Sequence, residues 1–296
     1  MSYDGVLIVN KPEGWTSHDV VNKARSIVGT RRVGHLGTLD PIATGVLPLL
    51  IGQATRLSQF LEKSEKAYYA TVRLGFATST YDRDGEPCGP ARAPCGTAEQ
   101  IELCLATMRG EISQTPPPVS AKKVRGVPAY KLVRKNLEVN LAPVRVFIYE
   151  LSQEEFDGTT VKLRVRCSAG TYVRAIAHEL GRQMSCGAHL EALVRTQSGP
   201  FRLDQAFTIE KLQELKDAGR LHEAVMDPAT LLPEFPPVMV DDATVTQIRQ
   251  GRDFAVSPFR VGAGAEHVKA VGPDGRLVAI GKIALPHVYH PLVVLS

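Results

Sequence analysis

No apolar run in the sequence approaches the ~20 residues that a membrane-spanning helix needs. The first residues, MSYDG, also lack the basic and then apolar pattern of a secretory signal peptide. These two absences lead us to expect a cytoplasmic protein with no membrane partner. The chain has 296 residues, of which 44% are hydrophobic and 22% charged, and these values are typical of a globular protein with two domains.

Cysteine is scarce and follows no disulfide or metal-binding pattern. The five cysteines are odd in number, and no two have Cys-x-x-Cys spacing, so the sequence predicts neither a disulfide framework nor a zinc ribbon. His287 and His290 are the closest pair of histidines, but no cysteine or acidic cluster accompanies them. We therefore expect no metal site.

Acidic residues are nearly missing between residues 119 and 145. This segment holds seven basic residues and one acid, Glu138, which gives it a net charge of +6, although the whole chain carries only +4. A local basic excess is typical of a surface that binds a polyanion. A solvated charged face explains the same pattern equally well.

Periodic apolar residues predict both strands and helices. The helix that follows Thr16 is expected to end at Gly29, because glycine is common just after a helix C-terminus. In the strand 161–167, alternation places Lys162, Arg164 and Arg166 on one face, which we interpret as solvated, with contact to nucleic acid as the less favoured alternative. The other expected strands are 5–10, 66–75, 144–148 and 187–201, and the other expected helices are 53–61, 97–110, 129–134, 171–184 and one starting at 208.

A proline-rich segment, DPATLLPEFPP at residues 227–237, indicates a domain boundary. The residues after it, 238–296, predict a small β-rich unit with a short helix near 243–250. Pro273-Asp274-Gly275 predicts the turn of a hairpin within this unit. We expect the larger domain to cover residues 1–232.

The loop at residues 32–48, RVGHLGTLDPIATGVLP, contains three glycines, two prolines and a single carboxylate, Asp40. Glycine and proline at this density predict a loop of defined shape that leads into a buried element. An aspartate before a proline is most often a turn residue that caps backbone amides. The loop alone therefore favours a structural role for Asp40.

Two residues far along the chain favour a chemical role instead. Tyr68 lies on the apolar side of the strand 66–75. Arg174 lies in the first turn of the helix 171–184, where the helix dipole disfavours a cation, so a carboxylate or a phosphate is expected to hold it. An arginine would keep Asp40 ionised, as a nucleophile must be. Together with the basic segment, these residues indicate a nucleic-acid enzyme that uses one carboxylate.

The sequence GHLGTLDPIATGVLP at residues 34–48 resembles the catalytic motif of the TruB family of tRNA pseudouridine synthases. The resemblance extends over residues 5–232, with Ile42 where the family usually has leucine and Val119 where it usually has an aromatic residue. Further blocks match the family in order and spacing: KPEG at 11–14, KAY at 66–68, SAKK at 120–123 with Gly126 and Tyr130, GTYVR at 170–174, and CGAHL at 186–190.

The resemblance implies a role for each matching residue. Asp40 would be the catalytic aspartate, and Arg174 would pair with it and orient it. Tyr68 would stack on the target base and is a candidate for moving the proton from C5. The remaining residues implied to bind substrate are Lys11, His35, Tyr172 and Leu193 around the pocket, and Lys122, Lys123, Arg125 and Tyr130 in an RNA-gripping thumb insert around 116–139. For His35, a loop-stabilising role is nearly as well supported as an RNA contact.

The resemblance also implies an α+β fold. A large mixed, mainly antiparallel sheet flanked by helices would be followed by a small PUA-like RNA-binding domain at 238–296. The enzyme would be a monomeric isomerase that converts the T-loop uridine, position 55 of tRNA, to pseudouridine, and would contact the T-arm and the acceptor arm. No redox change or external group is involved, so no cofactor is expected.

Three alternatives remain open at the level of the sequence. Asp40 either attacks C1′ of the sugar or removes a sugar proton to give a glycal. An RNA-guided relative that works in a ribonucleoprotein shares the same motifs, although the thumb insert favours an enzyme that acts alone. A non-catalytic RNA-binding or RNA-folding protein could use the same scaffold, although the presence of Asp40 disfavours it.

Overall fold

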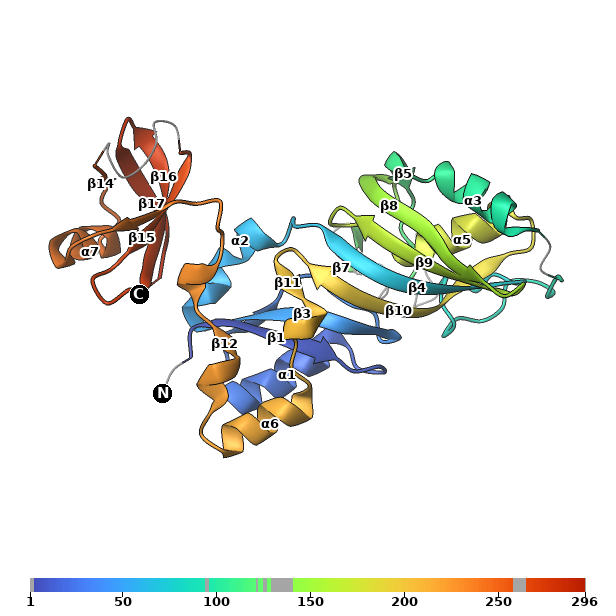
Figure 1. The fold of residues 1–296 in the computed structure, drawn as a ribbon, viewed down its shortest axis with the longest axis horizontal. Helices are drawn as coiled ribbons and strands as arrows, with labels where there is room; N and C mark the ends of the chain where they lie inside the picture. The colour runs from blue at the N-terminus through green and yellow to red at the C-terminus, as the bar shows by residue number, and fades with distance from the viewer. Residues whose placement is uncertain are drawn as a thin grey trace.

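The computed structural model describes residues 3–93, 96–120, 122–124, 127–128, 141–257 and 265–295. Most of the chain forms one large sheet with helices against it, and a second, smaller sheet lies at one end of the elongated molecule (Figure 1). The short helix expected at 129–134 lies outside the described residues. Among the described residues, no helix is long and apolar enough to cross a membrane.

The N-terminal segments form as the local sequence predicts. Strand β1 (Gly5–Lys11) is followed by helix α1 (Ser17–Val28). The side chain of Thr16 accepts a hydrogen bond from the amide of Asp19, whose carboxylate accepts one from the Thr16 amide, so the first turn is capped in both directions. Gly29 ends the helix with a φ of 71°, a left-handed conformation that glycine adopts easily.

The large sheet is mixed and mainly antiparallel, as expected. Its strands follow the spatial order β12-β1-β3-β10-β4-β9-β8-β5, in which β3 and β10 run parallel and the other neighbours antiparallel. Short strands β2 and β11 pair with β3 and β10. The bounds are β2 (Val33–His35), β3 (Ala43–Ile51), β4 (Lys66–Leu74), β5 (Gly110–Gln114), β8 (Val144–Phe156), β9 (Thr160–Cys167), β10 (Ala188–Ser198), β11 (Phe201–Arg202) and β12 (Val225–Met226).

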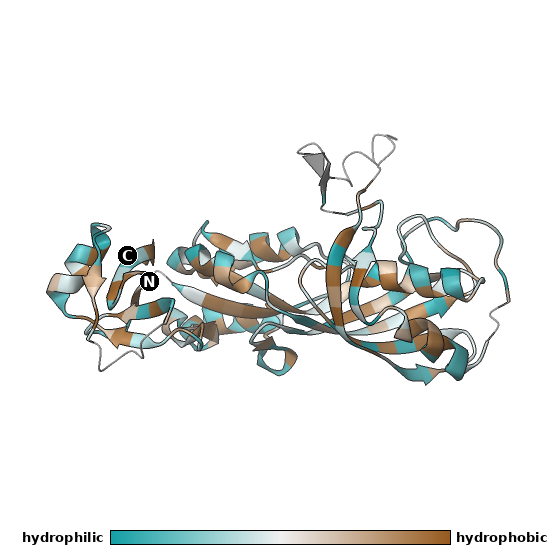
Figure 2. Cartoon of the chain, turned by 90° about the horizontal axis from the view of Figure 1, so that it is seen from above, coloured by the Kyte–Doolittle hydropathy of each residue, from teal (hydrophilic) through white to brown (hydrophobic). Residues whose placement is uncertain are grey.

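The helices bury apolar faces against this sheet. Besides α1, the longer ones are α3 (Ala98–Ala106), α5 (Val173–Gln183) and α6 (Ile209–Asp217), and their apolar residues belong to one continuous core with β4, β9 and β10. In Figure 2 the helices alternate between hydrophobic and hydrophilic colours, as in amphipathic helices, and the hydrophobic colour is prominent in the strands of the large sheet. The shorter helical segments are η1 (Gly52–Leu57), α2 (Ser58–Leu61), η2 (Leu203–Gln205), η3 (Leu221–Ala224) and η4 (Pro228–Thr230).

Two expected helices are shorter than predicted. The segment 53–61 is a 3-10 helix followed by a single α-helical turn rather than one continuous helix. The helix expected over 97–110 ends at Ala106, and Gly110 starts the edge strand β5. Gly110 has a φ of 82°, which lets the chain reverse at this point. An edge strand with one exposed face shows too weak an apolar pattern to be recognised in the sequence.

The C-terminal unit consists of β13 (Pro237–Met239), α7 (Asp242–Arg249), β14 (Phe254–Ala255), β15 (His267–Val271), β16 (Leu277–Leu285) and β17 (Val288–Val294). The predicted hairpin at 273–275 joins β15 to β16. The unit has a core of its own, but Ile280 and Val293 also pack in a second cluster with Leu50 and Leu57 of the larger part. The described parts of the two sheets are therefore joined by apolar contacts and not only by the linker.

Candidate active site

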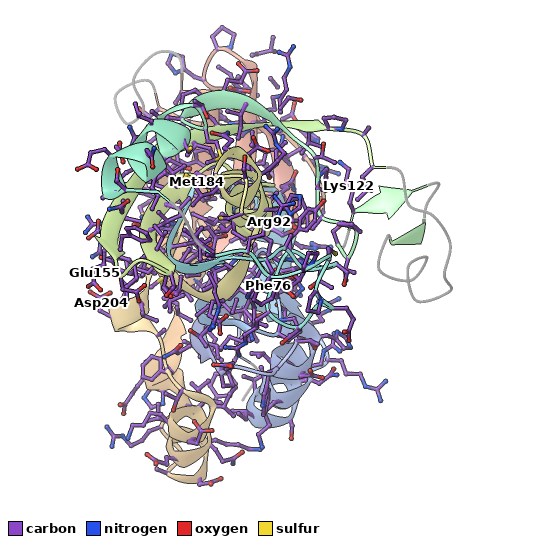
Figure 3. The ribbon with its side chains drawn as sticks, turned by 90° about the vertical axis from the view of Figure 1, so that its right-hand side faces the viewer. Phe76, Arg92, Lys122, Glu155, Met184 and Asp204 are labelled. Atoms are coloured by element: carbon purple, nitrogen blue, oxygen red, sulfur yellow. The ribbon has the colours of Figure 1, made fainter. Side chains whose placement is uncertain are left out.

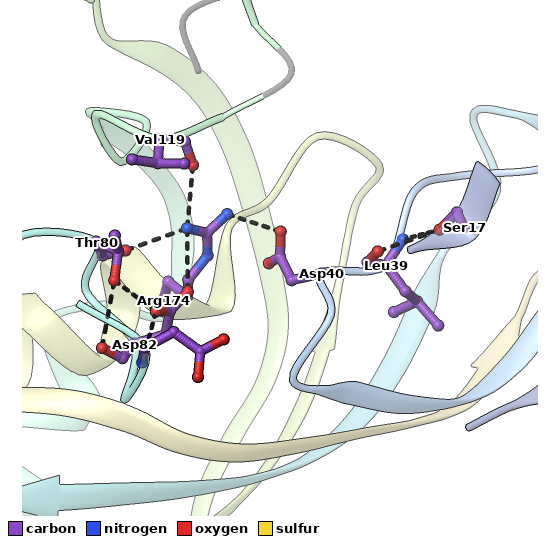
Figure 4. A network of polar contacts seen from close by, with 8 residues as sticks. Ser17, Leu39, Asp40, Thr80, Asp82, Val119 and Arg174 are labelled. Carbon is purple, nitrogen blue, oxygen red and sulfur yellow. Dashed lines mark hydrogen bonds and ion pairs between the residues drawn. The ribbon is translucent and has the colours of Figure 1, made fainter. Parts of the chain in front are cut away.

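Asp40 and Arg174 form a direct ion pair, although they are far apart in the sequence. Nη2 of Arg174 donates a hydrogen bond to Oδ1 of Asp40 at 2.8 Å (Figure 4). Arg174 is 4% exposed, whereas 34% of the Asp40 side chain is exposed. The carboxylate therefore lies at the surface of the site, on top of a buried cation.

Arg174 is held in place by three further groups. Its Nη1 lies 3.3 Å from Oδ2 of Asp82 and donates to the carbonyl oxygens of Thr80 and Val119 at 3.1 and 3.0 Å. Asp82 is itself buried, and the hydroxyl of Thr78 donates to its carbonyl oxygen at 2.6 Å. Figure 4 shows the guanidinium between Asp40 on one side and the Thr80–Asp82 turn on the other. These contacts fix the orientation of the Arg174 guanidinium.

Sequence reasoning did not single out Asp82. The residue lies in a loop without periodicity, where Asp84 and Glu86 are equally acidic and close by. The threonines at 78 and 80 are the nearest local signal, because hydroxyls flanking an aspartate often organise a turn around it. That signal indicates a structured turn, but it does not indicate an ion pair with a residue on another element.

The shape of the loop around Asp40 follows from specific backbone contacts. Oγ of Ser17, at the start of α1, accepts a hydrogen bond from the Leu39 amide at 2.8 Å and donates one to the Leu39 carbonyl at 3.1 Å. Gly45 has a φ of 99°, and a Cβ atom there would come within 2.3 Å of the Arg195 carbonyl oxygen. The loop therefore needs glycine at 45 to lie against β10.

Burial raises the pKa of the Asp40 carboxyl above its ordinary value. Arg174 lowers the pKa by favouring the charged form, and the nearby Asp82 carboxylate raises it because two negative charges repel each other. The arrangement is one buried cation between two carboxylates, of which only Asp40 is open to a substrate.

Tyr68 lies on the core side of β4, as the alternation predicts, and is 8% exposed. Burial raises the pKa of its hydroxyl, and the positive charge of Arg195 opposes this rise. Tyr68 and Arg195 are directly opposite each other in the β4–β10 ladder. Leu193, two residues before Arg195, is buried in the same strand. Sequence reasoning did not single out Arg195.

Two further residues support the loop and the helix around the ion pair. Lys11 is completely buried and donates from Nζ to the carbonyls of Pro12, Trp15 and Pro41, at 2.8, 2.6 and 3.3 Å. Burial lowers its pKa to about 8. The backbone of Tyr172 is held by the Gln114 amide, with hydrogen bonds of 2.8 and 3.1 Å. These contacts position the Asp40 loop and the start of α5.

His35 lies in β2, and its ring Nδ1 is buried without a hydrogen-bond partner among the described residues. Burial lowers the pKa of the ring, so the neutral form is favoured. Either ring nitrogen of a neutral imidazole can donate or accept a hydrogen bond, depending on the tautomer. Among the described residues, Nδ1 of His35 makes no hydrogen bond that would hold the loop.

The basic segment is described only in part. Lys122 is exposed, and Lys123 lies in the short strand β6 (Lys123–Val124), which pairs with β7 (Val127–Pro128). Arg125 and Tyr130 lie outside the described residues. Figure 3 shows Lys122 on the opposite side of the molecule from Glu155.

The basic residues of β9 behave as a solvated face, as expected. Lys162, Arg164 and Arg166 are exposed and form ion pairs with glutamates, Glu155 and Glu154 among them. Exposed pairs of this kind contribute little to stability. Within the described ranges, no group of three histidine, cysteine or acidic side chains is placed to hold a metal ion.

Comparison with known proteins gives consistent matches over the whole chain. A family model described as "TruB family pseudouridylate synthase (N terminal domain)" matches residues 25–173, and one described as "tRNA pseudouridylate synthase B C-terminal domain" matches residues 174–232. The chain is 56% identical over 292 residues to the tRNA pseudouridine synthase B of Solibacter usitatus (strain Ellin6076), covering 99% of this chain and 100% of the relative. It is 43% identical to the protein of the same name from Arthrobacter sp. (strain FB24), covering 93% and 92% of the two chains.

Solved structures share the fold. A structure described as an H/ACA RNP bound to a substrate RNA containing 2′-deoxyuridine is 25% identical, with a TM-score of 0.70 over 99% of this chain and 85% of that one. A Cbf5-Nop10-Gar1 complex is 27% identical, with a TM-score of 0.70 over 96% and 79% of the two chains.

Proposed function

The chain belongs to the TruB family of pseudouridylate synthases, and on that premise we propose that it converts the T-loop uridine at position 55 of tRNA to pseudouridine. The observation that carries this proposal is the partly exposed Asp40 carboxylate on the buried guanidinium of Arg174, at 2.8 Å. A reactive carboxylate must be both accessible and held in one orientation, and this pair meets both conditions.

The reaction exchanges one glycosidic bond for another. The N1–C1′ bond of uridine breaks, the base turns, and C5 bonds to C1′; N1 gains a proton and C5 loses one. Asp40 acts at the sugar, either by attack on C1′ or by removal of a sugar proton. The target base must leave the stack to reach a buried aromatic residue, and stacking on Tyr68 offsets part of that cost, which is a few kcal/mol.

The other predicted residues would shape the substrate pocket. Tyr172 and Leu193 would form its apolar walls, Lys11 would support the Asp40 loop through the Pro41 carbonyl, and His35 would help to hold the target RNA loop open. Lys122 and Lys123, with Arg125 and Tyr130, would bind RNA from the thumb insert around 116–139. No cofactor takes part in this scheme.

The domain division also belongs to the proposal. Residues 1–232 would form the catalytic domain, and 238–296 a PUA-like domain that contacts the acceptor arm while the catalytic domain holds the T-arm. The enzyme would act in the cytoplasm as a monomer. The apolar cluster shared by Leu57 and Ile280 supports a fixed distance between the two RNA-binding surfaces.

An enzyme that acts alone is favoured over an RNA-guided one. The relative at 56% identity is named as a tRNA pseudouridine synthase, whereas the H/ACA RNP structure and the Cbf5-Nop10-Gar1 complex are 25% and 27% identical. Purified full-length protein incubated with a T-arm minihelix, without any guide RNA, is expected to form pseudouridine at the T-loop position. A minihelix with cytidine at that position is the control. Tight binding of the minihelix without any product would overturn the proposal in favour of an RNA-folding protein.

A further inference from the structure

Arg195 is a buried cation that the proposed chemistry does not yet use. It is 1% exposed, and no carboxylate lies within ion-pair distance of it in the part of the chain that the structure describes. A buried arginine without a counter-ion is costly unless its donors are satisfied. Its Nε donates to the carbonyl of Val46 at 2.7 Å and its Nη2 to the carbonyl of Gly37 at 3.0 Å.

These two carbonyls lie on either side of Asp40 in the sequence. Gly37 precedes it by three residues, and Val46 follows it in β3, so one guanidinium ties together both ends of the loop that presents the carboxylate. Gly37 has a φ of 86°, and a Cβ atom there would lie 3.5 Å from Nη1 of Arg195. The loop backbone thus lies directly on the guanidinium.

The same residue is also the cross-strand neighbour of Tyr68. β10 lies between β3 and β4 in the sheet, and Arg195 is opposite Gly45 on one side and opposite Tyr68 on the other. Directly opposite residues of neighbouring strands project from the same face of the sheet, so the two buried side chains are cross-strand neighbours, and the Arg195 charge acts on the pKa of the Tyr68 hydroxyl. One residue therefore contacts the loop of the proposed sugar-side group and is the cross-strand neighbour of the proposed base-side group.

We propose that Arg195 is a positioning residue that holds the Asp40 carboxylate and the Tyr68 hydroxyl in a fixed relation, and that it assists proton loss from C5 of the rearranged base through Tyr68. This inference rests on the proposed function. In the step concerned, C5 already carries the sugar. Its C–H bond breaks, the electron pair forms the C5–C6 double bond, and the pair of the N1–C6 double bond moves to N1, which takes a proton from water. Tyr68 enters the step as a phenolate, its own proton having gone to water, and its oxygen takes up the proton from C5.

The charge of Arg195 has the right sign for this step. A cation beside the hydroxyl stabilises the phenolate, and it acts against the rise that burial imposes on the pKa of Tyr68. Lys66 is also buried, but its Nζ donates to the carbonyls of Glu62 and Ser64. Arg195 is therefore the cation whose contacts match the proposed proton transfer.

A C5 isotope effect separates this role from a purely structural one. Single-turnover rates are measured on a T-arm minihelix with protium or deuterium at C5 of the target uridine. For Arg195→Met we expect a rate about 10- to 100-fold lower, as for loss of a hydrogen bond to a charged group, and a larger C5 isotope effect because proton loss becomes slower. Arg195→Lys keeps the charge and is expected to recover part of the rate and most of the wild-type isotope effect.

The second measurement compares the effect of Arg195→Lys on the rate in the wild type and in Tyr68→Phe. It does not require Arg195→Met to fold. Without the hydroxyl, Arg195→Lys is expected to lower the rate by a smaller factor than it does in the wild type. The inference would be overturned if the C5 isotope effect were unchanged in the Arg195 variants. It would also be overturned if Arg195→Lys lowered the rate by the same factor in the wild type and in Tyr68→Phe. Absence of pseudouridine with the wild-type protein would instead contradict the proposed function itself.

Discussion

Two buried arginines contact the segment 37–46 that carries Asp40, and they differ in what surrounds their charge. Arg174 has two carboxylates, Asp40 and Asp82, and two backbone carbonyls. Arg195 has two backbone carbonyls and no carboxylate among the described residues, and Tyr68 is its cross-strand neighbour. The first charge is neutralised locally, whereas the second is compensated only by dipoles.

The difference indicates two ways of using a buried cation in one site. Neutralising carboxylates make Arg174 a fixed support for an anion, so its loss would leave two acids facing each other without a counter-ion. A cation that faces only dipoles keeps its field available to a neighbouring hydroxyl. The predictions below test this comparison, beginning with the group that Arg174 supports.

Replacing Asp40 by asparagine is expected to have the largest effect. The amide cannot act as nucleophile or base, so the single-turnover rate on the minihelix is expected to fall by at least about 10⁴-fold, as for loss of a group that makes the reacting contact. The affinity for the minihelix, measured by filter binding, is expected to stay near the wild-type value. Product at a near-normal rate would remove Asp40 from the chemistry.

Arg174→Met is expected to reduce the rate by about 10²- to 10³-fold, as for loss of a preorganised charged donor. It is also expected to lower the free energy of unfolding by about 3–5 kcal/mol, because a buried pair is broken and Asp82 stays buried without a counter-ion. Urea denaturation measures the second effect. Arg182→Met changes an exposed arginine on the same helix that pairs with Glu179, and little change in either quantity is expected for it.

Asp82→Asn tests whether the two carboxylates around Arg174 interact. Burial is the main cause of the raised pKa of Asp40, and the Asp82 charge adds to it. Asp40 acts in its ionised form, so the rate is lost as the pH falls through its pKa. Removing the Asp82 charge lowers that pKa, and the acidic limb of the pH–rate profile is expected to move to lower pH.

The same variant is expected to lose about tenfold in rate at neutral pH, because Arg174 loses one of its anchors. Asp84→Asn is the matched control, since Asp84 is exposed and two residues away. An acidic limb that moves equally in both variants, or moves to higher pH in Asp82→Asn, would contradict a direct interaction with Asp40.

Local patterns were sufficient for some parts of the site and insufficient for others. Strand alternation placed Tyr68 on the buried face, and the unfavourable position of Arg174 at a helix start correctly indicated an anionic partner. Asp82 lies in a loop among similar acids, so only the fold selects it. Arg195 acts through the neighbours of β10 in the sheet, and strand order is set by long-range packing that no local pattern contains.

Lys122→Gln is expected to have the smallest effect and tests the RNA contact of the basic segment. One phosphate contact contributes close to one unit to the slope of log affinity against log salt, so the slope is expected to become shallower by about 0.7–0.9. The rate at saturating minihelix is expected to stay unchanged, because Lys122 is exposed and makes no contact with the Asp40–Arg174 pair among the described residues. Lys162→Gln is the matched control: this lysine pairs with Glu155, on the opposite side of the molecule from Lys122. Equal slopes for the wild type and Lys122→Gln would place the RNA elsewhere, and a shallower slope for Lys162→Gln would place it on the β9 face.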